Sequence, residues 1–279
     1  MEKVKELILK EIPTVKEITF SKITKNNGVV YPACTIKDSN NNTSISKVVY
    51  YDENKSDEEI AASIIKTYLN DKAPNIDMDY IDKIFSDENL FLSKVKPMLV
   101  DPRRNSKLFE TVFRRQKYEY GLDLAVIYYI DLGYGTIKVT KSHLNKFYSL
   151  SCRDLHKNAI KNIEYTIQSI SDVLGGIPLP GTSIPIYVVS NKNHRYGASS
   201  MLSFSCMNKV KKMLNTDSLF ILPSSIHEVL CIPAEGHTDV KDIQNFKQMI
   251  ESINREVLSE DEFLSNNLYY YKDYSLRKI

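Results

Sequence analysis

The chain of 279 residues is long for one hydrophobic core, which predicts one large domain or two small ones. Its 42% hydrophobic and 26% charged residues are typical of a globular protein, and a net charge of +2 gives no overall attraction to nucleic acid. No apolar run approaches the ~18 residues of a membrane helix, and the first residues lack the features of a secretory signal. We therefore expect a cytoplasmic protein that does not associate with membranes.

The first third of the chain predicts a helix, a small antiparallel sheet and two further helices. Asn27 and Gly28 predict a tight hairpin, since both central residues of a type I′ turn need positive φ. Ser56 and Glu59 match a capping box at the start of a helix. The expected strands are residues 15–25, 29–36 and 44–51, and the expected helices are residues 1–12, 56–68 and 78–85.

The middle of the chain contains its most hydrophobic segment, LDLAVIYYI, at residues 122–130. Because this run is rich in β-branched and aromatic residues, we expect a central strand. Apolar residues alternate over 89–100, which predicts another strand, and residues 103–112 predict a short helix. The other expected elements are a strand at 136–140, helices at 142–147 and 151–163, and a Gly/Pro-rich loop at 175–181.

The last hundred residues predict a β-α-β-β-α layer, in which helices pack on sequential antiparallel strands. Two continuous apolar runs, 219–222 and 229–232, are expected to pair and to be covered by the helices around Leu202 and Phe246. A further strand is expected at 184–189. The remaining elements are helices at 198–214 and 239–258, and an edge strand at 268–271.

These patterns predict an α+β fold of small antiparallel sheets with packed helices. We expect an N-terminal subdomain at residues 1–87 and a C-terminal subdomain at residues 88–279. The cysteines are scattered and are expected to be reduced and buried: Cys34, Cys152, Cys206 and Cys231. A zinc site would need close pairs of ligands, and a nucleotide site a glycine-rich motif, so no metal or cofactor is expected.

The best candidate site is a polar insert between the two apolar runs, with the candidate catalytic residues Ser224, Ser225, His227 and Glu228. A hydroxyl, an imidazole and a carboxylate are the groups that a serine hydrolase needs. Close spacing does not supply the geometry, however, and the nucleophile elbow G-x-S-x-G is missing. We favour a hairpin loop whose serines bond to backbone groups while His227 and Glu228 bond to a neighbouring loop.

A second candidate site, for a ligand or partner, comprises His194, Arg195 and Tyr196. These residues precede an expected helix, and a helix N-terminus with an arginine can hold an anion. The alternative, which we favour, is a polar connection in which Gly197 allows close approach of the backbone. If the strands at 184–189 and 219–222 pair, the two candidate loops lie together.

A third candidate is the basic segment 94–117, which is opposed by two acidic residues only. Its basic residues are Lys94, Lys96, Arg103, Arg104, Lys107, Arg114, Arg115 and Lys117. Such a run can follow a phosphate backbone, with Arg103, Arg104, Arg114 and Arg115 as the candidate contacts. More often it is a solvated face of a helix and its flanks. Since no nucleic-acid motif accompanies it, we expect no nucleic-acid partner.

Five short phrases together resemble an uncharacterised domain-of-unknown-function family of Gram-positive gut bacteria. They are KNNGV at 25–29, GLDLA at 121–125, YGAS at 196–199, LPSSIHEV at 222–229 and NREVLS at 254–259. The resemblance covers nearly the whole chain, and LPSSIHE is its specific part. It implies a cytoplasmic bacterial protein and supplies no catalytic residues.

The interpretation favoured by these patterns is a non-catalytic cytoplasmic protein that binds a protein or a small ligand. One alternative is a small hydrolase that uses Ser225, His227 and Glu228. The other is a nucleic-acid binder that uses the segment 94–117.

Overall fold

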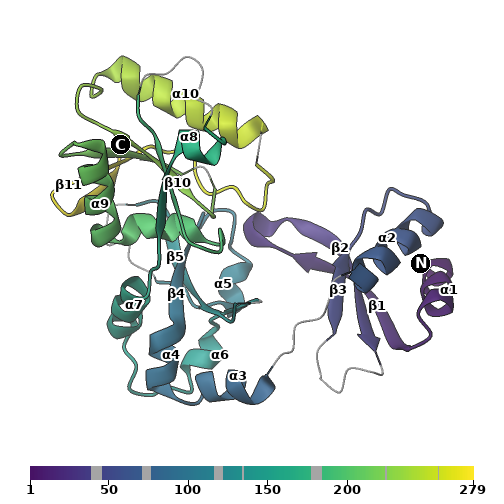
Figure 1. The fold of residues 1–279 in the computed structure, drawn as a ribbon. Coiled ribbons are helices and arrows are strands. Elements are labelled where there is room, and N and C mark those ends of the chain that lie inside the picture. Colours follow the sequence, from purple (N-terminus) through teal and green to yellow (C-terminus); the bar gives the residue numbers. More distant parts are fainter. Residues whose placement is uncertain are drawn as a thin grey trace. The chain divides into compact units, whose positions relative to one another are not determined.

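The computed structural model describes residues 1–38, 46–70, 77–115, 122–133, 135–176, 184–223, 225–256 and 258–279. Of the features predicted above, Ser224, Lys117 and most of the 175–181 loop lie outside them, as do the start of the strand at 44–51 and one residue of the helix at 239–258. The chain divides into two compact units, Met1–Asp79 and Tyr80–Ile279, each described by itself (Figure 1). The expected subdomains differ from these units in the placement of residues 80–87.

The first unit is a three-stranded antiparallel sheet in the order β1-β2-β3, with two helices packed on it. Its elements are α1 (Glu2–Glu11), β1 (Val15–Thr24), the 3-10 turn η1 (Asn26–Gly28), β2 (Val30–Asp38), β3 (Lys47–Tyr50) and α2 (Asp57–Asn70). Side chains from all three strands and both helices share one core, including Ile8, Ile18, Cys34, Val49 and Ile64. Burial of this apolar surface holds the small sheet together.

Two local predictions for this unit are confirmed. Asn27 and Gly28 have φ values of 59° and 72°, as the predicted hairpin requires. The amide of Ser56 donates to the Glu59 carboxylate at 3.0 Å, and the amide of Glu59 donates to the Ser56 hydroxyl at 3.3 Å. This reciprocal pair is the capping box that starts α2.

The second unit contains two antiparallel sheets, in the orders β4-β5-β6 and β12-β11-β9-β10-β8-β7. From the unit boundary its elements are α3 (Met78–Ile84), α4 (Glu88–Lys94), β4 (Val95–Val100), α5 (Leu108–Thr111), β5 (Ala125–Asp131), β6 (Thr136–Lys138), α6 (Lys141–Leu144), α7 (Cys152–Lys161), β7 (Thr166–Ser169), α8 (Ile170–Val173), β8 (Tyr187–Ser190), η2 (Gly197–Leu202), α9 (Phe204–Leu214), β9 (Leu219–Leu222), β10 (Val229–Pro233), α10 (Val240–Glu256), β11 (Tyr269–Lys272) and β12 (Ser275–Lys278). The α+β class and the predicted C-terminal β-α-β-β-α order are confirmed.

The strands β9 and β10 pair as predicted and are buried on both faces. Ile221 and Cys231 belong to a core that also includes η2, α9 and the strands β4 and β5. Phe220 and Ile232 belong to a second core, with α10. Helices α9 and α10 therefore cover opposite faces of the six-stranded sheet, which explains why both strands are continuously apolar (Figure 1).

Two predictions in the middle of the chain are wrong. The first half of the strand expected at 89–100 is the helix α4, because the Asp87 carboxylate accepts the amide N–H of Leu90 at 3.0 Å and caps its start. Most of the helix expected at 103–112 is a turn. The buried Asp101 carboxylate accepts the amide of Arg103 at 2.9 Å, and α5 begins only at Leu108.

The order of the six-stranded sheet differs in three ways from the arrangement considered from the sequence. The strand β8 pairs with β10 and not with β9, because β10 lies between them. The tail strand β11 is an interior strand, because β12 pairs with its other side. The edge strand β7 was not predicted, since its four residues are too short and polar to stand out in the sequence. Among the cysteines, Cys34, Cys206 and Cys231 are buried, whereas Cys152 is exposed.

Candidate functional site

The two candidate loops lie together in the structure. The strand β8 ends at Ser190, and β10 begins at Val229, which lies opposite Val189 in the antiparallel register. The loop after β8 and the loop before β10 therefore leave the same end of adjacent strands. From the sequence, their meeting was conditional on pairing of 184–189 with 219–222, whereas the pairing that brings them together is β8 with β10.

A single side chain, Asn191, shapes the first loop. Its carboxamide oxygen accepts the amides of Asn193 and Arg195, both at 3.1 Å, and its Nδ2 donates to the Arg195 carbonyl at 2.7 Å. His194 and Tyr196 have φ values of 48° and 60°, in the left-handed region that non-glycine residues seldom adopt. Three side-chain bonds thus fix a loop conformation that the backbone does not favour by itself.

His227 joins the second loop to the first. Its Nδ1 accepts the Tyr196 amide N–H at 3.2 Å, and its ring stacks on the Tyr196 ring with centroids 5.7 Å apart. Its Nε2 lies 3.7 Å from the carboxylate of Glu262. Burial lowers the pKa of His227, while the charge of Glu262 opposes that shift. Both ring nitrogens therefore face a partner within the protein.

Ser225 is buried and makes no bond to the imidazole of His227. Its hydroxyl instead accepts the backbone N–H of His227 at 2.9 Å, and its own amide donates to the Glu228 carbonyl at 3.3 Å. A serine nucleophile needs the imidazole of a base within hydrogen-bond reach. In the described part of this loop, hydroxyl and imidazole are each bonded to a backbone amide instead.

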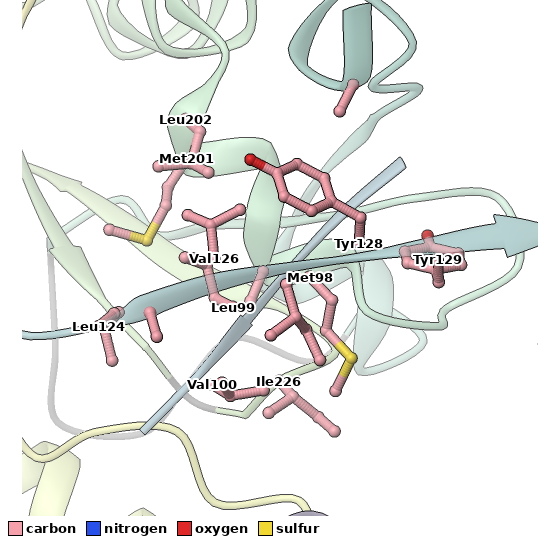
Figure 2. Packing of buried hydrophobic residues seen from close by; sticks show 14 of the residues in the cluster. Met98, Leu99, Val100, Leu124, Val126, Tyr128, Tyr129, Met201, Leu202 and Ile226 are labelled. Carbon is pink, nitrogen blue, oxygen red and sulfur yellow. The ribbon is translucent and has the colours of Figure 1, made fainter. Parts of the chain in front are cut away.

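The apolar residue of the SSIHE sequence anchors the loop. Ile226 is 4% exposed and belongs to the same core cluster as Met98 and Val100 of β4 (Figure 2). Its amide donates to the Glu262 carbonyl at 2.9 Å, and its carbonyl accepts the amide of Ala198. Core burial and backbone bonds together fix the position of the loop.

Gly197 allows the two loops to approach as closely as the sequence predicted. A Cβ at this position would lie 2.5 Å from the His227 carbonyl oxygen and 2.5 Å from Ser190 Oγ. The Ser190 hydroxyl donates to that carbonyl at 2.7 Å. The helix that follows, η2, has six residues, and its early amides of Ala198 and Ser199 donate to backbone carbonyls.

His194 is exposed and lines a cavity of about 510 Å³. The other residues around the cavity come from β7 and its flank, from the same loop and from α9: Tyr165, Thr166, Ile167, Gln168, Lys192, Lys209 and Met213. Of these residues, the sequence had indicated only His194, because β7 was not foreseen and α9 carries Lys209 on a face without a motif. Arg195 and Tyr196 are half-buried, and the Tyr196 ring packs edge-on against Tyr129 at 5.1 Å.

The basic segment does not form one face. Lys94 ends α4, Lys96 is on β4, and Arg103 and Arg104 are in the turn beside Asp101. Several of its charges have partners: Lys96 Nζ lies 2.9 Å from Glu164, Arg103 Nε lies 3.1 Å from Asp101, Arg104 stacks on Phe263 and Arg114 stacks on Phe109. The helix face that we favoured from the sequence is therefore wrong, since among residues 101–115, where the structure describes this stretch after β4, only Leu108–Thr111 forms a helix.

Within the described ranges, no cluster of three or more His, Cys, Asp or Glu residues could hold a metal ion. None of the helices among these residues combines the length and hydrophobicity that a membrane span requires.

Comparison with known proteins gives one match. No curated protein and no solved structure matches the chain. A family model described as a family of unknown function, DUF5688, matches residues 1–273. Since this match covers almost the whole chain, the protein belongs to the DUF5688 family.

Proposed function

We propose that this protein is a non-catalytic interaction protein of the bacterial cytoplasm, which binds a protein partner through the loop at 191–196. Of the two expected partner classes, a protein segment suits the cavity beside His194, which is open and extends along a strand. The resemblance to proteins of Gram-positive gut bacteria and the free thiols support the cytoplasmic assignment.

This proposal rests on the bonds that the Ser225 hydroxyl and the His227 imidazole make within the protein itself. The Ser225 hydroxyl accepts the His227 amide, and the His227 imidazole accepts the Tyr196 amide. A catalytic hydroxyl and its base would have to be bonded to each other and accessible to a substrate. The geometry supports a role for LPSSIHE as a support for the neighbouring loop.

The exposed residues of the loop at 191–196 are the part of this site that is accessible to a partner. Lys192, Asn193 and His194 are exposed, whereas the loop ends are fixed by Asn191 and His227. Binding residues commonly lie on loops that a rigid scaffold positions. A loop with a fixed backbone also loses little conformational entropy when a partner binds.

A selection from a random peptide library displayed on phage, with the full chain immobilised, tests this proposal. We expect related sequences to be enriched, and their binding to weaken by about tenfold or more in His194→Ala. His237→Ala is the matched control, because His237 is also a part-exposed histidine but contacts Asp242 and Phe246. Failure to enrich related peptides, or binding that is the same in His194→Ala and the parent, would contradict the proposal.

A further inference from the structure

The edge of the six-stranded sheet offers backbone groups to a further strand. The register of β7 with β8 places Thr166 opposite Ser190 and Ser169 opposite Tyr187. On its other side, β7 pairs with no strand formed by the described residues. In an antiparallel pair, alternate residues turn their N–H and C=O groups away from the partner strand. The edge β7 therefore has the geometry that strand addition requires.

The cavity beside His194 runs along this edge. Four consecutive residues, 165–168, line it. Of these, 166–168 belong to β7. Because successive side chains of a strand point to opposite faces of the sheet, a cavity that contacts all three follows the backbone edge. Lys209 and Met213 of α9 also line it, and Met213 is 43% exposed. The cavity thus offers backbone groups along β7 and an apolar contact from α9.

The charged residues that line this cavity are basic. They are Lys192 and Lys209, and none of the described residues lining the cavity is acidic. The carboxylate of the adjacent Glu164 lies 2.9 Å from Lys96 Nζ and is partly neutralised by it. An occupant with negative charge would therefore complement the cavity, and a basic occupant would be repelled.

We propose that β7 binds an extended acidic peptide segment of a partner protein as an additional strand, with its carboxylates near Lys192 and Lys209. This inference rests on the proposed function and specifies its partner. Main-chain bonds to β7 would supply affinity, and the lysines would select the charge of the peptide. Pairing of β7 with β7 of a second copy is disfavoured, since it would bring the same lysines of both copies together.

Two measurements on peptides enriched by the phage selection test the inference, both by fluorescence anisotropy with the full chain. The first compares the parent with the double variant Lys192→Glu, Lys209→Glu. We expect binding to weaken by about tenfold or more, because attraction becomes repulsion. The matched control is Lys241→Glu, Lys272→Glu, which makes the same charge change at exposed lysines of α10 and β11.

The second measurement replaces each peptide amide N–H in turn with N-methyl. Strand addition predicts weaker binding at every second position, because only alternate amides donate to β7. A melting temperature equal to that of the parent establishes that each protein variant retains the fold.

The outcomes separate this inference from the proposed function. Three outcomes would overturn the inference and leave the proposed function standing. The enriched peptides would not be acidic, or they would bind the Lys192→Glu, Lys209→Glu variant as tightly as the parent, or N-methylation would weaken binding without alternation along the peptide. Binding of a nucleic acid through Lys192 and Lys209, together with failure of the selection to enrich any peptide, would overturn both.

Discussion

His227 makes two contacts with one residue of the neighbouring loop, since its Nδ1 accepts the Tyr196 amide at 3.2 Å and its ring stacks on the Tyr196 ring. The Tyr196 backbone has a left-handed φ of 60°, which non-glycine residues seldom adopt. His227 therefore contacts the loop at a residue whose backbone conformation is unfavourable by itself. The SSIHE loop therefore stabilises the loop that carries His194. This relationship connects the SSIHE loop with the proposed binding surface.

Removal of this contact should destabilise the protein. We expect His227→Ala to lower the free energy of unfolding by about 1–3 kcal/mol, because the Tyr196 amide loses its acceptor and the ring contact is lost. His227→Asn should recover part of this loss, since the asparagine carbonyl oxygen can accept the same amide. Urea denaturation measures both variants. A His227→Ala protein as stable as the parent would show that the contact contributes nothing.

Gly197 should not tolerate a side chain. In Gly197→Ala the new methyl group would lie 2.5 Å from the His227 carbonyl oxygen, and relief of this overlap requires movement of the backbone. We expect a loss of about 1–3 kcal/mol in the free energy of unfolding. Gly135→Ala is the matched control, because a Cβ there meets nothing within 4 Å. Equal stability of the two variants in urea would contradict the close packing of the two loops.

A buried histidine of α7 should make stability depend on pH. His156 Nδ1 lies 3.0 Å from the Tyr128 hydroxyl, and its buried Nε2 has no hydrogen-bond partner among the described residues. Burial, assisted by the charge of Arg115, lowers the pKa of His156 from 6.5 to about 4. The folded protein thus keeps the neutral ring at pH values where the unfolded chain is already protonated.

The sign of the pH effect follows from linkage. The stability contributed by neutral His156 is fully present above pH 6.5 and is lost as the pH falls towards about 4. We expect this group to account for a loss of about 3 kcal/mol over that range. Urea denaturation of the parent and of His156→Gln between pH 7 and pH 4 measures the difference. Identical pH dependence of the two proteins would contradict the lowered pKa.

Local features of the fold could be predicted because their determinants are close in sequence. The Asn27-Gly28 turn and the Ser56–Glu59 capping box each need a few adjacent residues. The strands β9 and β10 are predictable because burial on both faces leaves a continuous apolar run. The helix α4 was missed where a cap signal, Asp87, competed with an alternating apolar pattern.

Strand order could not be predicted in the same way, because it depends on contacts between distant segments. The pairing of Val189 with Val229 depends on how helices pack on the two apolar faces of the sheet. Short-range sequence patterns do not contain that information. The cavity beside His194 was missed for the same reason. The wall of this cavity includes β7, a strand of four mostly polar residues that forms only because it pairs with the edge of β8.

The basic segment should not bind nucleic acid specifically. Its arginines are distributed over a turn and a short bridge region, and Arg103 is partly neutralised by Asp101. We expect affinities for DNA and RNA no tighter than roughly 10⁻⁴–10⁻⁶ M at physiological salt, which is the non-specific range. Gel-shift titrations at low and physiological salt measure this. Submicromolar binding that disappears in Arg114→Glu, Arg115→Glu would contradict the expectation.

The central claim is that the LPSSIHE loop supports a binding surface and performs no hydrolysis. A broad screen of ester and peptide substrates with the parent, Ser224→Ala, Ser225→Ala and His227→Asn tests it most directly. We predict that the parent hydrolyses no substrate faster than the three variants, because the Ser225 hydroxyl and the His227 imidazole are bonded to backbone amides. Hydrolysis by the parent that is lost in a serine variant and in His227→Asn, while the variants remain folded, would contradict the claim.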